Sequence, residues 1–513
     1  MAKEVIQSKC RDKTNELSST DREELMRNAV ACMLKAQYDI VMLLKNSDAE
    51  LIAEIEACCD VLKEALPETS ADIAASIVNL GAAHCSRGAY EKGLECYQRA
   101  LAIFQETLPP THVIFADLLC NMGQAFDVLS DHEKSLDCLQ RALAIRQESL
   151  PALHLDIAAS LDSIGDAYQN INEYQKCLDY HTRALAIREA TLSDVHPLIA
   201  VSLHGVGQAY FGLGDQTKSL EYYQHALAIR EKSLPALHPD IAATLLGIGE
   251  LYSNFGDEEK SLDYFERALA IQEQSLPAVH ASLASTLVRI AQIHVSYSTT
   301  EGNHNISLEY YQRALAIQEQ TLTALHPNIA LTLGSIGEVL GMLGEFKKSL
   351  EYHKRALAIN EQSLPALHPS IAFTLCGLAR AHGDLGDQQK SMKYYQRALA
   401  IQEQSMPALH PTIATTLRGI GHAHAELGDQ KKCLDYCQRA LAIQEQSLPP
   451  LHPNIAASLY DIGKVYASLG DYEKCLAHLK RALAIYKESL PAMHPLISQI
   501  LNGIKQVFAR LRK

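Results

Sequence analysis

Apolar residues recur along this chain at the three- and four-residue spacing of amphipathic α-helices. In residues 240–281, Ile241, Leu245 and Ile248 fall on one face of a predicted helix over 241–254, which we call helix A. This spacing differs from the strict alternation that half-buried β-strands require. The pattern therefore predicts helices and no sheet.

Turn-forming residues end this helix and separate it from a second one. Gly256 and Asp257 supply a left-handed C-cap and a polar turn, and the following apolar residues predict helix B from about Glu259 to Leu276. Pro277 ends helix B because proline has no N–H to donate to the helix. We therefore expect an all-α chain of helix A/helix B hairpins.

The hairpin pattern repeats with a period of 42 residues. The pentapeptide Arg-Ala-Leu-Ala-Ile, once with His in place of Arg, begins at Arg99, Arg141, Arg183, His225, Arg267, Arg313, Arg355, Arg397, Arg439 and Arg481. A row of histidines keeps the same spacing: His112, His154, His196, His238, His280, His326, His368, His410, His452 and His494. Both markers place four extra residues between His280 and Ser307, and we interpret Ser298–Asn305 as a lengthened turn.

These markers divide the chain into stacked units. Ten units cover 72–495, nine of 42 residues and one of 46 at 282–327. Residues 30–71 keep the register and are interpreted as a degenerate capping hairpin, preceded by a partly helical segment over 1–29. Residues 496–513 match the first half of a unit, which predicts a C-terminal capping helix. Because each hairpin buries its apolar stripe only against its neighbours, we expect a solenoid.

Seven positions of each unit resemble the tetratricopeptide repeat (TPR). The family pattern W-x2-L-G-x2-Y…A-x3-F…A is matched, with Leu in place of Trp, by Leu245, Ile248, Gly249, Tyr252, Ser261, Phe265 and Ala268. The 42-residue unit is longer than the usual TPR and is most similar to the repeats of kinesin light chains and nephrocystin-type proteins. The resemblance implies a right-handed superhelix with helix A lining its concave side.

Composition narrows the classes of function. Hydrophobic residues make up 47% of the 513 residues, enough for a large core. With 46 Lys and Arg against 60 Asp and Glu, the formal net charge of −14 argues against nucleic acids and anionic membranes as partners. The first residues hold no apolar signal core or membrane span, and the 13 cysteines form no C-x-x-C pair. We therefore expect buried free thiols, a cytoplasmic location and no membrane insertion.

No catalytic, metal or cofactor site is predicted. Neighbouring repeats lie about 8–10 Å apart, whereas zinc ligands lie about 2 Å from the ion, so the histidine row is expected to be structural. His294, His382 and His424 replace the Tyr of the TPR pattern and are expected to be aromatic residues at the edge of the core. There is no Gly-rich phosphate loop, no nucleophile motif and no leftover segment of catalytic-domain size. We therefore expect no enzyme.

Helix B and the connectors are nearly identical from repeat to repeat, whereas helix A differs. We count the small residue at the helix crossing, usually Gly, as position eight. In the later repeats positions five and nine supply four basic residues: Arg380, Arg418, His422 and Lys464. These are expected to form the most cationic stretch of the concave face and to bind an acidic segment or a free C-terminus. The alternatives are neutral drift, or solvated charges that balance Asp384 and Glu426.

The earlier repeats carry acids on the same face: Asp117, Asp127, Asp162 and Asp166. Asn79 and Asn121 occupy position six, where kinesin-light-chain repeats usually have Asn. The candidate peptide groove therefore also includes Asn79, Asn121, Asp162 and Asp166. Later repeats have glycine at position six, which predicts a wider groove without a peptide-binding amide: Gly205, Gly247, Gly377 and Gly419.

Three functions follow from this pattern. The first is a non-catalytic adaptor that binds peptide segments of other proteins. The second is a kinesin-light-chain-like cargo adaptor that joins a kinesin heavy chain, although residues 1–45 hold no sustained heptad of the kind light chains use to join the motor. The third, an RNA-reading helical array, is disfavoured by the acidic balance and the lack of a basic, aromatic-lined groove.

Overall fold

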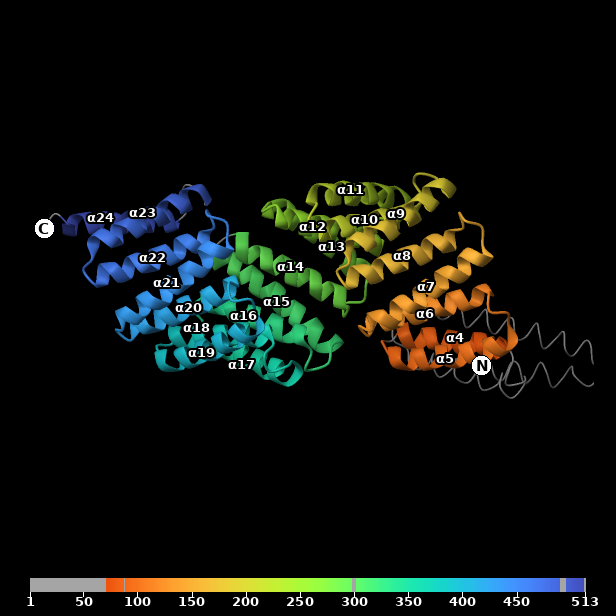
Figure 1. Cartoon of the computed structure of the whole chain (residues 1–513), viewed down its shortest axis with the longest axis horizontal. Helices are drawn as coiled ribbons and strands as arrows, with labels where there is room; N and C mark the ends of the chain where they lie inside the picture. The colour runs from red at the N-terminus through yellow and green to blue at the C-terminus, as the bar shows by residue number, and fades with distance from the viewer. Residues whose placement is uncertain (1–70, 87, 298–300, 490–494, 512–513) are drawn as a thin grey trace, which may run out of the picture. The chain divides into compact units, whose positions relative to one another are not determined.

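The computed structural model describes residues 71–86, 88–297, 301–489 and 495–511, and all regular structure in these ranges is α-helical (Figure 1). The chain divides into two compact units, residues 1–277 and 278–513. The predicted segment over 1–29 and nearly all of the predicted capping hairpin over 30–71 lie outside the described residues.

Helix A and helix B alternate along both units. The first unit contains α4 (Ala71–Ser86), α5 (Tyr90–Thr107), α6 (Val113–Val128), α7 (His132–Ser149), α8 (Leu155–Asn170), α9 (Tyr174–Thr191), α10 (Pro197–Gly212), α11 (Gln216–Ser233), α12 (Pro239–Asn254) and α13 (Glu258–Ser275). The second contains α14 (Ala281–Tyr297), α15 (Glu301–Thr321), α16 (Pro327–Met342), α17 (Phe346–Ser363), α18 (Pro369–Asp384), α19 (Gln388–Ser405), α20 (Pro411–Glu426), α21 (Gln430–Ser447), α22 (Pro453–Ser468), α23 (Tyr472–Ser489) and α24 (Pro495–Leu511).

Each unit is a stack of helical hairpins. From α4 to α22, each helix A packs along its own helix B, and within a unit each helix B packs on the next helix A. Successive helix A segments also touch, as α16, α18 and α20 do in the second unit. The prediction of an all-α solenoid of helix A/helix B hairpins is confirmed.

A histidine side chain caps the start of helix A. Nδ1 of His238 accepts a hydrogen bond from the backbone N–H of Asp240 at 3.2 Å, and Pro239 occupies the first turn, where its missing N–H costs nothing. The same cap forms at His112, His154, His196, His280, His326, His368, His410 and His452. The structural role predicted for this row is confirmed at these positions, and His494 lies outside the described residues.

The turn between the two helices depends on backbone conformation and a second cap. Gly256 adopts φ +74°, a left-handed conformation that glycine reaches at little cost. The carboxylate of Asp257 then accepts a hydrogen bond from the backbone N–H of Lys260 and pairs with its ammonium at 2.7 Å. This arrangement reverses the chain and starts helix B.

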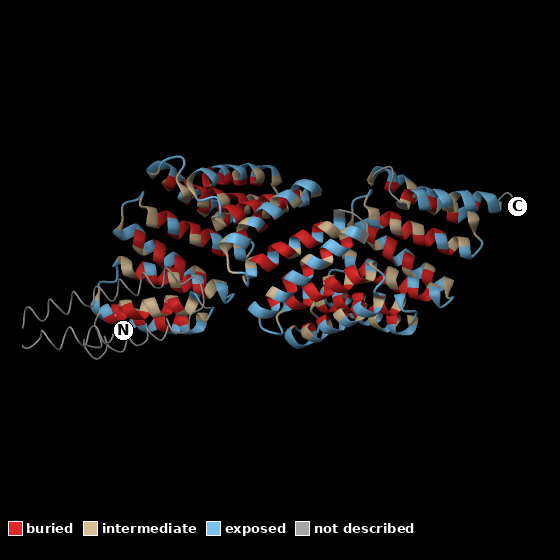
Figure 2. Ribbon diagram, turned by 180° about the vertical axis from the view of Figure 1, so that it is seen from behind, coloured by how far each residue is buried: buried red, intermediate tan, exposed pale blue. Residues whose placement is uncertain are grey.

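Small residues let helix A and helix B cross closely. A Cβ added at Gly249 would lie 3.0 Å from the ring of Phe265, and Ala268 is fully buried. Figure 2 shows the consequence as buried stripes on the helix faces that meet inside each hairpin. The three histidines expected to be aromatic residues at the edge of the core stack on tyrosines: His294 on Tyr310, His382 on Tyr394 and His424 on Tyr436.

The four-residue insertion is absorbed mainly by helix. Helix A and helix B have 16 and 18 residues in the regular repeats, as in α12 and α13, but 17 and 21 residues in α14 and α15. Residues 301–305 form the first turn of α15, so the prediction of a lengthened turn over Ser298–Asn305 is wrong for them. Helical hydrogen bonding can satisfy these added backbone groups, which favours extending the helix over lengthening the loop.

The cysteines that the structure describes are free thiols, and only Cys85 and Cys376 among them are not fully buried. This confirms the expectation of free thiols at the described positions, and of buried ones at all of these except Cys85 and Cys376. In the same part of the chain, no helix is both long enough and apolar enough to cross a membrane.

Candidate functional site

The four predicted basic residues lie on three consecutive helix A segments of the second unit. Arg380 is on α18, Arg418 and His422 are on α20, and Lys464 is on α22. Direct contact between α18 and α20 brings the first three close together. Sequence spacing therefore selected residues that the fold places on neighbouring helices.

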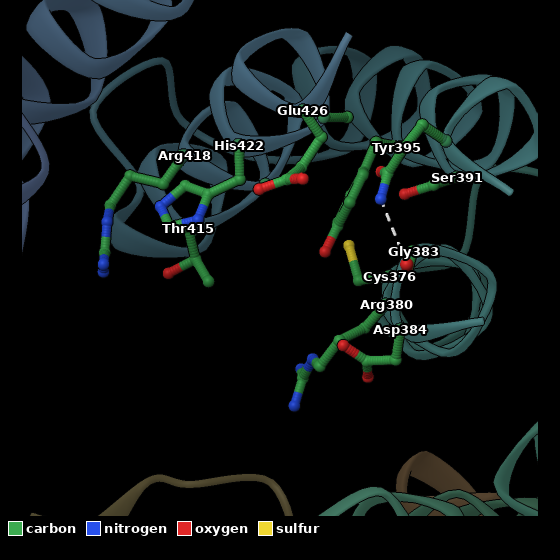
Figure 3. A pocket seen from close by; sticks show the side chains of 13 residues that line it. Cys376, Arg380, Gly383, Asp384, Ser391, Tyr395, Thr415, Arg418, His422 and Glu426 are labelled. Atoms are coloured by element: carbon green, nitrogen blue, oxygen red, sulfur yellow. Dashed lines mark hydrogen bonds between the residues drawn. The ribbon is translucent and has the colours of Figure 1, made fainter. Parts of the chain in front are cut away.

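A polar pocket of about 620 Å³ opens between α18 and α20, with α19 at its side. We call it the α18–α20 pocket. Arg380, Arg418 and His422 line it, together with the hydroxyl-bearing Tyr395 and Thr415. In Figure 3, Arg380 extends from one helix, Arg418 and His422 extend from the other, and Tyr395 reaches in between them. Lys464 does not line the pocket, although it joins the same charge network.

This network is centred on Asp461, a buried residue of α22 that the sequence analysis did not select. Arg418 donates from Nε and Nη2 to its Oδ2 at 3.1 and 2.8 Å, and His422 Nε2 lies 2.9 Å from the same oxygen. Lys464 Nζ lies 3.5 Å from Oδ1. Burial would raise the pKa of Asp461, but the hydrogen bonds and charges of His422 and Arg418 outweigh it and hold the pKa well below its usual range.

Asp461 orients these basic groups without removing them from solvent. The side chain of Asp461 is 8% exposed, whereas those of Arg418, His422 and Lys464 are 22%, 51% and 54% exposed. Arg380 is held differently, by an ion pair of 3.2 Å with Glu338 on α16. The partners of the basic residues are therefore Asp461 and Glu338, and not Asp384 and Glu426, which the sequence had offered as the balancing charges.

In the first unit, the carboxylate oxygens of Asp162 already contact other side chains of the protein. Its carboxylate contacts Arg188 Nη1 at 2.5 Å, His181 Nδ1 at 2.8 Å and the hydroxyl of Ser202 at 3.1 Å. The side chains of Asp162, His181 and Arg188 are 7%, 2% and 4% exposed. Asp162 therefore joins α8, α9 and α10 inside the core and leaves no oxygen for a ligand.

The remaining predicted groove residues of this unit are separate from that core network or at its edge. Asp166 is 64% exposed and lies 3.5 Å from His181 Nε2. Asn79 on α4 and Asn121 on α6 are half-buried. Asp117 pairs with Arg146 at 2.6 Å, and Asp127 contacts His132 at 2.9 Å.

The glycines at position six lie directly against large side chains. The space above each one is filled by a large side chain of the preceding helix B: His181 above Gly205, Tyr223 above Gly247, His353 above Gly377 and Tyr395 above Gly419. A Cβ at Gly247 would lie 2.8 Å from the Tyr223 ring. These glycines therefore accommodate the packing of one repeat on the next, and the wider groove stays a prediction, since Gly419 also lines the α18–α20 pocket.

Sequence reasoning also missed the residue that directly follows each Arg-Ala-Leu-Ala-Ile segment. Arg146, Arg188 and Arg230 are buried there and donate across to the next helix A, as Arg188 does to the carbonyl of Leu198 and the hydroxyl of Ser202. In later repeats Asn360 makes the same type of contact with Thr374. The sequence did contain a signal for this role. At this position of the repeat, three consecutive repeats have Arg, and several later repeats have Gln or Asn.

Nothing in this geometry resembles a metal centre. Within the ranges that the structure describes, no group of three or more His, Cys, Asp or Glu side chains could hold a metal ion. The molecule is thus defined by a stack of helical hairpins that carries a charged pocket on consecutive helix A segments.

Family models agree with this architecture. Tetratricopeptide repeat models match residues 72–148, 156–232, 241–282, 297–362, 374–405 and 412–488. These ranges cover well over half of the chain, so the chain belongs to the tetratricopeptide repeat family. The resemblance inferred from Leu245, Gly249, Tyr252 and their equivalents is confirmed. None of the curated proteins compared with the chain matches its sequence.

Several solved structures are similar to parts of the chain. A Podosopora anserina protein named as a kinesin light chain with nearly identical TPR-like repeats is 21% identical, with 41% of this chain and 98% of that chain covered and a TM-score of 0.35. BtubC (BKLC) from P. vanneervenii is 20% identical, with coverages of 47% and 92% and a TM-score of 0.37. The apo form of RapI is 15% identical, with coverages of 73% and 98% and a TM-score of 0.48.

Proposed function

We propose that this chain is a non-catalytic adaptor of the cytoplasm that binds peptide segments of partner proteins in the α18–α20 pocket. The observation that carries the proposal is the convergence of Arg380, Arg418 and His422, from two consecutive helix A segments, on one pocket of about 620 Å³. Membership of a family of protein-interaction scaffolds supports the same conclusion.

The dimensions and the electrostatics of the pocket suit an extended acidic segment. The α18–α20 pocket spans about 8–10 Å between two consecutive helix A segments, and the charge network continues to Lys464 on a third, so that Arg380 and Lys464 lie roughly 20 Å apart. About six residues of extended chain cover that distance. Because Asp461 already orients Arg418 and His422, binding would cost less side-chain entropy than it does for mobile basic residues. A ligand carboxylate would approach their exposed edges.

The experiment that tests this proposal uses Arg380→Glu. The matching change at Arg418 is unsuitable because it would place a second carboxylate beside the buried Asp461. A fluorescent library of hexapeptides built from Glu, Lys and Ala is measured by fluorescence anisotropy at low and high salt. We expect members that contain Glu to bind, to lose affinity about tenfold or more in the variant, and to weaken as salt rises.

The matched control is Arg397→Glu on α19. Arg397 is exposed and pairs with Glu361 away from the pocket, so its reversal changes the net charge by the same amount. Equal affinity of the wild type and Arg380→Glu for every bound peptide would contradict the proposed site. Circular dichroism checks that both variants keep their helicity.

A kinesin-light-chain-like cargo adaptor is the second candidate function, and the 42-residue period favours it. A pull-down with purified kinesin heavy chain tests it directly. Retention of the heavy chain would support the motor role, and its absence among retained proteins would leave the general adaptor role.

A further inference from the structure

A second row of charges borders the α18–α20 pocket. Asp384 lies four residues after Arg380 on α18, and Glu426 lies four residues after His422 on α20. Both acids occupy position thirteen of helix A. The other repeats have no acid at this position, where they carry Ser86, Val128, Asn170, Gly212, Asn254, Ser296, Met342 and Ser468.

The acidic row differs from the basic row in its pairing. Arg380 pairs with Glu338, and Arg418 and His422 share Asp461. In the part of the chain that the structure describes, neither Asp384 nor Glu426 forms an ion pair, and both are exposed at the pocket. The unpaired charge that the pocket presents to a ligand therefore includes two carboxylates as well as the exposed edges of the basic groups.

The two rows have the geometry of a groove with one charge sign on each side. Four residues of helix separate them, which is about 6 Å along each helix axis. Each row runs from α18 to α20, over about 8–10 Å. An extended peptide that follows the rows sends successive side chains to opposite sides, and side chains on the same side repeat about every 7 Å. One side then faces Arg380 and His422, and the other faces Asp384 and Glu426.

We propose that the α18–α20 pocket selects an extended peptide in which acidic and basic residues alternate, in preference to a continuous acidic run. This inference rests on the proposed peptide-binding function. An all-acidic peptide would bring like charges against Asp384 and Glu426, and an all-basic peptide would do so against Arg380 and Arg418. Only the alternating peptide offers an opposite charge to both rows.

Three labelled hexapeptides test the inference by fluorescence anisotropy at low ionic strength: alternating Glu and Lys, all Glu, and all Lys. We expect the alternating peptide to bind about tenfold or more tighter than either of the others. The double variant Asp384→Asn, Glu426→Gln should weaken the alternating peptide and strengthen the all-Glu peptide, so that the preference is lost or reversed.

The control double variant Glu403→Gln, Asp435→Asn removes the same number of carboxylates from exposed sites on α19 and α21 that do not line the pocket. This variant should still prefer the alternating peptide, as the wild type does. The control therefore distinguishes the effect of the two carboxylates at the pocket from the effect of a changed net charge. Tighter or equal binding of all-Glu peptide to the wild type would overturn the inference and leave the proposed function intact. Failure of all three peptides to bind would overturn both.

Discussion

His181 in the first unit and His353 in the second occupy the same position of helix B, yet they favour opposite protonation states. Both are 2% exposed. Each ring packs between a glycine of its own helix A and a glycine of the next: Gly165 and Gly205 for His181, Gly337 and Gly377 for His353. The repeat gives both histidines the same steric surroundings.

The charged neighbours differ, above all at position five of helix A. Asp162 stands at position five beside His181, and although burial alone would lower the pKa of His181, the hydrogen bond and charge of this carboxylate help to raise it to about 10. Gly334 stands at the equivalent position beside His353, whose pKa is lowered to about 4 by burial and by the charge of Arg380. In the described structure Nδ1 of His353 has no hydrogen-bond partner. A repeat position therefore specifies packing, whereas charge depends on individual neighbours.

The largest expected effect follows from removing the carboxylate in the first unit. Asp162→Asn leaves Arg188 buried without the carboxylate it pairs with and leaves His181 only the more distant Asp166, and breaking a buried ion pair typically costs about 3–5 kcal/mol. We expect a clear fall in the thermal midpoint and faster hydrogen exchange in α8, α9 and α10, because local stability in a solenoid depends on neighbouring repeats.

The matched control is Asp137→Asn, which removes an exposed acid that pairs with Arg141 on the same helix. Such pairs contribute about 0–1 kcal/mol. If both variants lost the same free energy of unfolding, the buried carboxylate of Asp162 would contribute no more than an exposed one, which would contradict the comparison.

The second effect is the contribution of His181 to the pH dependence of stability. Its folded-state pKa of about 10 lies above the unfolded value of about 6.5, so its stabilisation is fully present below pH 6.5 and is lost as pH rises toward 10. The loss should amount to a few kcal/mol, with Asp162, Asp166 and Arg188 as the charged groups facing the ring.

Urea denaturation at several pH values between 6 and 10 measures this dependence. His181→Gln should flatten the curve over that range, because the titrating proton is removed. His353→Gln should not affect the loss above pH 7.5, and should remove only a rise of up to about 1 kcal/mol between pH 6 and 7.5, because the folded His353 is neutral there while the unfolded one still loses a proton. A flat wild-type curve would argue against a protonated His181.

The smallest expected effect comes from introducing into the second unit the carboxylate that His353 lacks. Gly334→Asp places a carboxylate at position five, where an added Cβ finds its nearest atom, in Phe373, at 3.8 Å. By analogy with Asp162, this carboxylate would reach the unpartnered Nδ1 of His353. We expect the pKa of His353 to rise from about 4 to above 6, as measured by NMR titration of the imidazole. Gly334→Ala, which adds only a methyl group, should leave that pKa near 4.

Local pattern was sufficient for the helices, and three of the eight predicted groove residues that it selected line the α18–α20 pocket. The period of 42, the glycine and proline positions and the histidine caps act over a few residues, so they can be recognised without knowledge of the packing. The same column comparison selected Arg380, Arg418 and His422, which line one pocket. The insertion was misread because Gly302, Asn303 and Asn305 favour turns by local preference, whereas the structure places residues 301–305 at the start of α15.

The sequence by itself determined the repeat, the hairpin and the family, because these follow from spacing along the chain. Only the tertiary structure decided which charges are paired. Asp461 lies 43 residues from Arg418, and Asp162 lies 40 from Ser202, so their pairing depends on how one helix A packs beside the next. The same packing filled the space above the position-six glycines with aromatic and imidazole rings. Contacts between repeats are set by side-chain size and direction across a helix interface, and a single unit's sequence does not specify them.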